Sequence, residues 1–258
     1  MEDGAQKIKP TTKFAGLKNV LAFMAQVRKL QDRPPGHPNI GVFYGFSGYG
    51  KSYASIYAQI KSNAVRVEVM RDWRLTNFLR AILQECGVAE PKGARAELVE
   101  QAIELLGEDM RRPLFVDEAD WCVENNFIET VRQIADRAMI PVLLLGEEKL
   151  PEKLARIERV HNRVLDWTPA QPCDLNDCKL LAQVHAPGLA LEDALLERFL
   201  LEGQGRARRV VISLAHAVDW ARNKGATSIT AASYDGEVYR GEAPRARQLK
   251  IVNGGRAA

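Results

Sequence analysis

The sequence has no long apolar run, few cysteines and no low-complexity segment. Its longest apolar stretches, such as PVLLLG at residues 141–146, are far shorter than the roughly 20 residues that span a bilayer. The opening segment MEDGAQKIKPTTKF has no apolar core before a cleavage site, as a secretory signal would. We therefore expect a cytoplasmic protein that has no membrane partner.

The four cysteines do not have the spacing of a metal site. Cys173 and Cys178 are separated by four residues, and no second pair of Cys or His completes a zinc set with them. Cys86 and Cys122 stand alone. The simplest interpretation is four ordinary reduced thiols, which excludes the disulfide-rich and zinc-binding classes.

Length and charge allow one large domain, or a domain with a small appendage. The 258 residues are 46% hydrophobic and 27% charged, as in a globular protein. The net charge of +3 hides an asymmetry, because residues 203–258 carry 10 Lys and Arg against 4 Asp and Glu. A basic C-terminal quarter is compatible with an anionic partner, although solvated tails are often basic too.

Apolar patterns predict helices that alternate with short strands. Helical spacing covers residues 13–30, with Phe14, Leu17, Leu21, Met24, Val27 and Leu30 on one face. Further on, the pattern predicts strands at 40–45, 65–70, 113–117, 140–146 and 163–167, and helices at 51–60, 75–86, 94–106 and 124–138. Such alternation is typical of an α/β fold, here a parallel five-stranded sheet with helices on both faces.

After Pro172 the strand signals stop, and three helical patterns follow at 174–184, 191–202 and 206–223. We therefore expect four parts: an N-terminal helix or arm at 1–34, an α/β core at 35–170, a small helical lid at 171–240 and a flexible basic tail at 241–258.

The stretch from Gly45 to Ser52 matches the phosphate-binding pattern G-x-x-x-x-G-K-[ST]. Glycines let backbone N–H groups turn inward around a phosphate, and the following helix points its positive end at the same anion. Lys51 would neutralise the β- and γ-phosphates, and the Ser52 hydroxyl would hold Mg²⁺. The alternative, a chance glycine turn, would have to fall between a strand and a helix by accident. The predicted ATP-binding residues are Gly45, Ser47, Gly48, Tyr49, Gly50, Lys51, Ser52, Tyr53 and Asp117.

A pair of acids follows the third predicted strand, in PLFVDEAD. Asp117 would be delivered to the metal with Ser52, and Glu118 would orient and deprotonate the attacking water. An acidic helix cap is the alternative, but the pair lies 65 positions after Ser52, where a phosphate loop needs its complement. The sequence thus predicts an ATPase that uses ATP and Mg²⁺.

The string Asp117-Glu118-Ala119-Asp120 also invites comparison with helicases. A helicase of that type needs a Ser-Ala-Thr motif soon after and a second recombinase-like domain. Here the fourth strand ends in LLLGEE, and the remaining 138 residues are mostly helical. We therefore reject the helicase interpretation.

Two arginine sites indicate the subclass. RIERVHNRVLDW places Arg159 and Arg163 before the last strand, and GQGRARR places Arg208 at the start of a lid helix. With these residues, the chain resembles the AAA+ ATPases over roughly residues 35–225. The resemblance implies that Arg208 is the second sensor and that Arg163 is the finger that reaches a neighbouring subunit's ATP, with Arg159 as the other candidate. Any of the three could instead be a solvated surface charge.

Within that superfamily, the compact core and the segment LLLGEEKLPEKL resemble the transposition-regulator ATPases of the phage Mu B and TnsC type. This resemblance implies a slow, DNA-stimulated ATPase of a bacterial or phage-infected cell. It would assemble into ATP-dependent helical filaments on duplex DNA of any sequence and would select targets for a transposase and activate it. Two features depart from that pattern. Only about 35 residues precede the first strand, whereas phage Mu B proteins carry an N-terminal helix-turn-helix region. The segment Gly146–Glu147 also lacks the usual polar residue of a first sensor.

Other functions remain open from the sequence. One is a helicase loader or initiator of the same superfamily, and another is a signalling NTPase that switches a protein partner without DNA. If DNA binds, the resemblance places its contacts after the second strand and near the next helices. The candidates there are Arg71, Arg74, Lys92 and Arg95.

Overall fold

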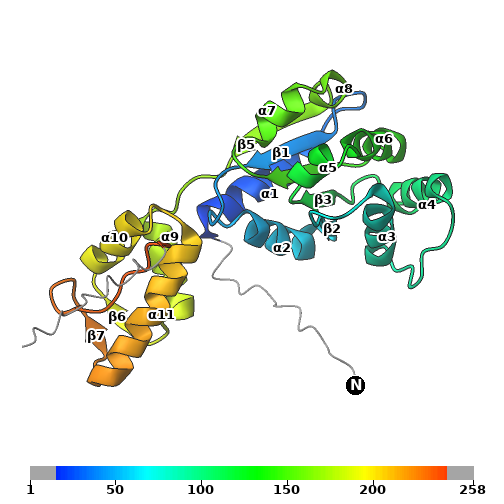
Figure 1. Ribbon diagram of the computed structural model, residues 1–258. Helices are drawn as coiled ribbons and strands as arrows, with labels where there is room; N and C mark the ends of the chain where they lie inside the picture. Colours follow the sequence, from blue (N-terminus) through cyan, green and yellow to red (C-terminus); the bar gives the residue numbers. More distant parts are fainter. Residues whose placement is uncertain (1–15, 243–258) are drawn as a thin grey trace, which may run out of the picture.

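The computed structural model describes residues 16–242, which form an α/β core joined to a helical lid (Figure 1). The core sheet has five parallel strands in the order β2-β3-β4-β1-β5. Its strands are β1 (Ile40–Tyr44), β2 (Val65–Glu68), β3 (Leu114–Asp117), β4 (Val142–Gly146) and β5 (Val164–Pro169). The predicted five-stranded parallel sheet is confirmed.

Helices cover both faces of this sheet. They are α1 (Lys18–Gln31), α2 (Lys51–Ser62), α3 (Leu75–Glu85), α4 (Arg95–Gly107), α5 (Asp120–Glu124), α6 (Ile128–Ala138), α7 (Leu150–Ala155) and α8 (Glu158–His161). No helix within residues 16–242 combines the length and the apolar character that crossing a bilayer requires.

The strands are apolar on both faces because both faces are buried. In β4, Val142 and Leu144 pack with α3, α4 and α6, whereas Leu143 and Leu145 pack with α1 and α2. A parallel strand covered on both sides is typically a continuous apolar run, which is why VLLLG shows no alternation.

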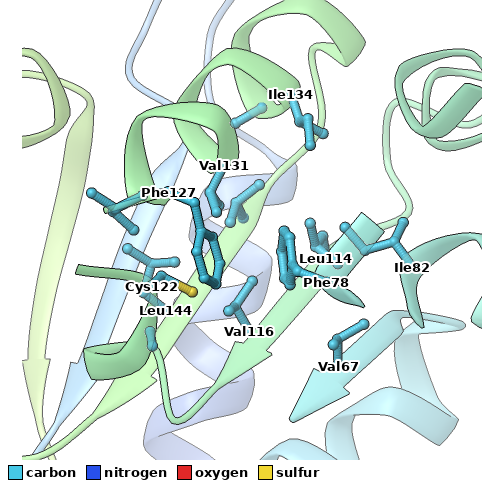
Figure 2. Packing of buried hydrophobic residues seen from close by; sticks show 14 of the residues in the cluster. Val67, Phe78, Ile82, Leu114, Val116, Cys122, Phe127, Val131, Ile134 and Leu144 are labelled. Carbon is cyan, nitrogen blue, oxygen red and sulfur yellow. The ribbon is translucent and has the colours of Figure 1, made fainter. Parts of the chain in front are cut away.

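One apolar layer lies between the sheet and helices α3 and α6 (Figure 2). Phe78 of α3 lies against Phe127, with ring centroids 5.4 Å apart, and both rings are buried. Truncating such a ring to alanine typically costs about 3–5 kcal/mol of stability. This layer holds the loops after β2 and β3 in place.

Two predicted helices differ in the structure. The helix expected at 124–138 begins only at Ile128, as α6, and the short α5 before it ends at Glu124. Between them Asn126 has a φ of 58°, and the Asn125 side chain bonds the carbonyls of Arg71 and Trp73. In α1 the buried face includes Asn19 and Gln26, whereas Leu21, expected inside, is 57% exposed. Phe14 lies outside the described residues.

The lid consists of α9 (Leu175–His185), α10 (Asp193–Glu202) and α11 (Ala207–Lys224) around its own apolar cluster. The expectation of no strand after Pro172 is wrong, since β6 (Ala190–Leu191) pairs in parallel with β7 (Ser228–Ile229). These strands are two residues long, too short for a sequence pattern to reveal. The four predicted domain boundaries stay a prediction, and residues 1–15 and 243–258 of the arm and tail lie outside the described part.

Candidate nucleotide-binding site

The strand order gathers the predicted site at one edge of the core sheet. Parallel strands end at the same edge, so the loops after β1, β3 and β4 are neighbours there. These loops carry Gly45–Ser52, the acids Asp117 and Glu118, and the segment Gly146–Glu147. Residues from three separate stretches of sequence thereby lie together.

The loop from Gly45 to Ser52 has the backbone of a phosphate cradle. Gly48 and Gly50 both have φ of 87°, a conformation that other residues rarely adopt. Gly50 precedes the first residue of α2, and no atom lies within 4 Å of the place where its Cβ would be. The loop therefore leads directly into the positive N-terminal end of a 12-residue helix.

Lys51 lies folded over this loop. Its Nζ donates to the carbonyl oxygens of Gly45 at 2.6 Å and of Phe46 at 3.1 Å. Burial lowers the pKa of Lys51, and the nearby negative charges, led by Glu118 and Asp117, act against that shift. The ammonium group is thus held beside the cradle with acids across from it.

The two predicted acids have different surroundings. Asp117 is buried and accepts hydrogen bonds from Arg66 Nη2 at 2.5 Å and from the Glu118 N–H at 3.1 Å. Glu118 is only partly buried and has a φ of 55°. Burial raises the pKa of Glu118, as does the charge of Asp117, while Lys51 lowers it. Such a carboxyl binds a proton more readily than an ordinary glutamate, which suits a general base.

A third acid, Asp120, connects the loops that follow β3 and β4. Its carboxylate accepts the Glu147 N–H at 2.8 Å and Lys153 Nζ at 2.7 Å, and Lys153 also binds Glu124. Burial alone would lower the pKa of Lys153, but these hydrogen bonds raise it to about 12. A Cβ at Gly146 would collide with the Asp120 carboxylate and the Leu150 side chain, so these two residues occupy the room that a polar first sensor would need.

The lid contacts the loop through the start of α11. The Arg208 N–H donates to the Gly48 carbonyl at 3.3 Å, while its side chain is exposed. Arg206, which sequence reasoning missed, donates from Nη1 to the Ser47 carbonyl at 3.2 Å and lies 5.9 Å from the Phe46 ring centre. Tyr53 packs against apolar residues of both the lid and the core. The predicted loop residues and lid arginine are therefore neighbours.

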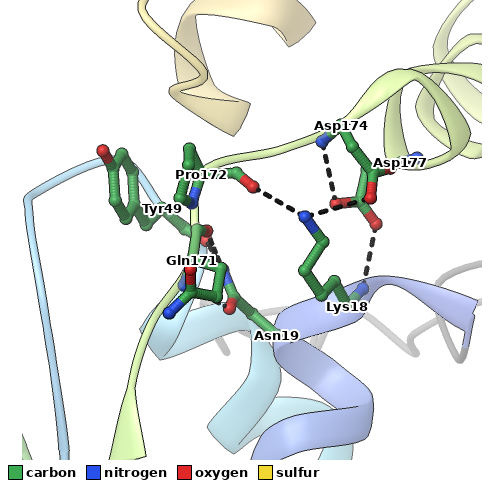
Figure 3. Close-up of polar contacts among 7 residues, drawn as sticks. All are labelled: Lys18, Asn19, Tyr49, Gln171, Pro172, Asp174 and Asp177. Atoms are coloured by element: carbon green, nitrogen blue, oxygen red, sulfur yellow. Dashed lines mark hydrogen bonds and ion pairs between the residues drawn. The ribbon is translucent and has the colours of Figure 1, made fainter.

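A second link to the lid comes from the start of α1 (Figure 3). Asn19 donates to the carbonyls of Tyr49 at 2.7 Å and Gln171 at 2.8 Å, and it accepts the Gln171 N–H at 2.8 Å. Lys18 binds the Pro172 carbonyl and forms an ion pair with Asp174 at 3.0 Å. One turn of α1 therefore connects the loop, the core–lid linker and α9.

The donor set fits a nucleotide and Mg²⁺. Positive φ glycines, a lysine and a helix N-terminus suit phosphate, and the Ser52 hydroxyl and Asp117 carboxylate are the oxygen ligands that Mg²⁺ prefers. Within residues 16–242, no group of three or more His, Cys, Asp or Glu could hold a metal by itself. That agrees with an ion held largely by substrate phosphates and water.

The finger candidates lie away from this site. Arg132, Arg159, Asn162 and Arg163 line an open cavity of about 370 Å³ beside α6 and α8. The Arg163 Nε donates to Asp136 at 3.1 Å, and its side chain is 48% exposed. Arg159 is exposed and forms no hydrogen bond or ion pair with any residue from 16 to 242. The chain's own finger candidates thus face outward.

The four candidate DNA contacts do not form one cluster. Arg71 and Arg74 precede α3, and Arg71 lies over the Trp121 ring at 5.7 Å. Lys92 and Arg95 come after α3, and Lys92 pairs with Glu90. All four side chains are exposed, and they lie at the two ends of an 11-residue helix.

Residues 33–154, a little under half of the chain, match the family model described as an AAA domain. That segment begins before β1 and ends in α7, so it contains the loop and both acids. The fold is that of an AAA+ P-loop NTPase. This confirms the predicted fold class.

Solved structures show the same AAA+ fold. The Orc2 protein of Aeropyrum pernix, in ADPNP–ADP complexes, matches with a TM-score of 0.64 at 16% identity, over 86% of this chain and 65% of that one. The Orc1 protein of the same organism, in complex with DNA, matches with a TM-score of 0.60 at 15% identity, over 80% and 60%. Cdc6p from Pyrobaculum aerophilum gives 0.61 at 18% identity, over 86% and 67%. The chain thus spans about 60–67% of the length of these structures. No curated protein sequence matches it.

Among the groups at the site that sequence reasoning missed are Asn19, Arg66, Asp120 and Arg206. For Asn19 and Arg66 the signal was a polar residue among apolar ones, in α1 and in VRVEV. For Arg206 the signal was its place next to the predicted second sensor. Asn19 and Arg206 donate to backbone carbonyls, which no pattern of residue types reveals. Arg66 bonds side chains of β3 and α2, which only the fold brings beside it.

Proposed function

We propose that the chain binds and hydrolyses ATP with Mg²⁺ and uses the nucleotide state to assemble on duplex DNA, as an initiator or helicase loader of the AAA+ class. The observation that carries the proposal is the juxtaposition of Lys51, Asp117 and Glu118. They lie beside a loop that the first turn of the lid helix α11 contacts at Gly48. The likeness to initiator structures, one in complex with DNA and one with adenine nucleotides, supports the choice of class.

The chemistry follows from the residues. Lys51 and the α2 N-terminus would bind the β- and γ-phosphates, and Mg²⁺, held by Ser52 and Asp117, would offset charge that develops on the phosphoryl group. Glu118 would take the proton from the attacking water. Arg208 would then report the nucleotide state to the lid, because its backbone already contacts the loop.

A neighbouring subunit completes this mechanism. The arginines of the α6–α8 cavity lie outside the chain's own site, so they can act only on another chain's phosphate. Arg159 is the freer side chain, whereas Arg163 would first have to leave Asp136. ATP should therefore promote assembly, and assembly should promote hydrolysis.

The transposition-regulator hypothesis stays a second candidate. It rests on the resemblance of LLLGEEKLPEKL and the compact core, and the matched structures favour the initiator type over it. Both candidates require ATP-dependent assembly on DNA, and they differ in the partner, a replicative helicase or a transposase.

The test measures ATP turnover and sedimentation, with and without duplex DNA of unrelated sequences. We expect ATP and DNA together to produce large assemblies and faster turnover, with DNA affinity falling steeply as salt rises through counterion release. Arg163→Ala and Arg159→Ala should keep ATP affinity within about threefold, and the variant that lacks the finger should lose assembly and DNA-stimulated turnover.

Arg137→Ala is the matched control, because Arg137 is an exposed arginine of α6 that pairs with Glu100 outside the cavity. A wild type that stays monomeric with ATP and DNA, and that turns over at one rate in both conditions, would contradict the proposal. That result would favour a signalling switch. If ATP and DNA do produce assemblies, pull-down with a helicase or with a transposase separates the two DNA-dependent candidates.

A further inference from the structure

Arg66 is a buried charged group at the site that the proposed mechanism does not use. It lies on β2, next to β3, and its side chain is only 13% exposed. Its Nη2 donates to Asp117 at 2.5 Å, and the Asp117 side chain is 2% exposed. The predicted metal ligand is therefore already in a buried ion pair with a residue of this chain.

The guanidinium is held on a second side. Its Nε donates at 2.8 Å to the hydroxyl of Ser55, which is fully buried on α2. Ser55 in turn donates to the Ser52 carbonyl at 2.8 Å. A continuous chain of hydrogen bonds thus runs from Asp117 through Arg66 and Ser55 to the backbone of Ser52, so it joins the two residues expected to share the metal.

The two contacts that fix the Arg66 guanidinium, with Asp117 and Ser55, are buried. Within residues 16–242 its one further partner is Glu68, at 3.3 Å, whose side chain is 62% exposed. Since an arginine keeps its charge at any pH a protein survives, Asp117 has a permanent positive neighbour. A divalent cation that approaches Asp117 must share the carboxylate with that charge and is repelled by it.

We propose that Arg66 is a resident counter-charge for Asp117 that weakens the coupling between Mg²⁺ and nucleotide binding, so that the site can hold nucleotide with little help from the metal. Without Mg²⁺, Arg66 already offsets the repulsion between Asp117 and the phosphates. With Mg²⁺, it reduces what the metal adds. This inference rests on the proposed nucleotide site and specifies how that site depends on its metal.

The experiment measures the dissociation constant of a fluorescent, non-hydrolysed ATP analogue in excess Mg²⁺ and in EDTA. The readout is the ratio of the EDTA value to the Mg²⁺ value. Arg66→Met removes the charge, and Arg66→Gln removes it but can still donate to Asp117. In both variants we expect the ratio to rise at least about tenfold above wild type, within the usual range of coupling between two ligands.

Three controls isolate the charge. Arg66→Lys keeps a cation beside Asp117. Ser55→Ala keeps Arg66 but removes the hydroxyl that its Nε binds. Both variants should therefore give ratios near wild type. Arg112→Met removes an arginine that binds the Asn63 carbonyl at the opposite end of β3 and should change nothing. Circular dichroism of every variant establishes that it is folded. If both uncharged variants unfold without ligand, the rise in melting temperature on adding the analogue with Mg²⁺, compared with EDTA, replaces the ratio.

The outcomes separate two failures. Uncharged variants whose ratio equals or falls below that of wild type would overturn the role of Arg66 and leave the nucleotide site standing. A wild type that binds the analogue in neither buffer would overturn the proposed function, and this inference with it.

Discussion

The core and the lid contribute to the nucleotide site in different ways. The core supplies charged side chains that are buried and already paired, such as Asp117 with Arg66 and Asp120 with Lys153. The lid supplies exposed arginines and a few backbone contacts, such as the Arg208 N–H on the Gly48 carbonyl. One half of the site is assembled before any ligand arrives, and the other half can move.

This difference has a physical basis. A buried ion pair is hard to open, because each separated charge would lie in a poorly polarisable interior. Contacts between exposed groups open at little cost, since water replaces them. Changes in the core should therefore abolish binding or chemistry, whereas changes at the lid and at the start of α1 should alter affinity and stability by smaller amounts.

The largest effect is expected from Lys51→Ala. This variant loses the ammonium group held over the loop and should no longer bind ATP detectably, because the phosphates would face Asp117 and Glu118 with little compensation. Isothermal titration calorimetry measures the affinity. Lys61→Ala, at the far end of the same helix, is the control. Unchanged affinity in Lys51→Ala would refute the site.

The next effect is expected from Glu118→Gln. The amide cannot take a proton, so turnover should fall at least about 100-fold while ATP still binds. A steady-state phosphate-release assay measures it, and assemblies should persist longer in this variant. Glu147→Gln serves as the comparison, because Glu147 lies after β4 near the same site. If Glu147→Gln, and not Glu118→Gln, abolishes turnover, the base is Glu147.

A smaller effect tests the link between the halves. Asn19→Ala would leave the Tyr49 carbonyl and both polar groups of the Gln171 backbone without their partner, at a cost of about 1–3 kcal/mol of unfolding free energy. Nucleotide affinity should fall a few fold as well. Denaturant unfolding and calorimetry measure the two quantities.

Gln171→Ala is the control for Asn19, because the exposed Gln171 side chain bonds only the Pro169 carbonyl among residues 16–242 and its backbone contacts would remain. Equal loss of stability in the two variants would mean that the α1 contact is not what links the loop to the lid.

The smallest effect is a dependence on pH. Since burial and Asp117 raise the pKa of Glu118, the folded chain holds this proton more tightly than the unfolded chain does. The stability that the folded chain gains from protonated Glu118 is fully present below the pKa that Glu118 has in the unfolded chain. It is lost as pH rises through the higher pKa of Glu118 in the folded chain. Glu118→Gln, which resembles the protonated side chain, should melt about 1–3 °C above wild type near pH 7.5 and level with it near pH 4. If Glu118→Gln raises the melting temperature equally at both pH values, the charge of Glu118 is not the cause of the rise.

The structure of the core could be predicted from the sequence more completely than that of the lid, and the reason is physical. Buried parallel strands are continuous apolar runs, and a phosphate loop needs Gly50 and Lys51 at set positions, so both leave strong patterns. The second strand pair, β6 and β7, has two residues per strand and leaves none. Arg66 looked like the polar member of an alternating strand, and only the fold shows that it points at Asp117.

Gly146 and Asp120 share one small volume at the end of β4, where a side chain on the first would strike the carboxylate of the second. Evolution or a protein engineer can therefore not install a polar residue at Gly146 in one step. The Leu150 side chain crowds the same place, so smaller residues at positions 120 and 150 would both have to come first. The change at 120 would release the Lys153 ammonium and the Glu147 backbone together. The route to a more conventional active site passes through a less stable intermediate, so this lineage can be trapped with the arrangement it has.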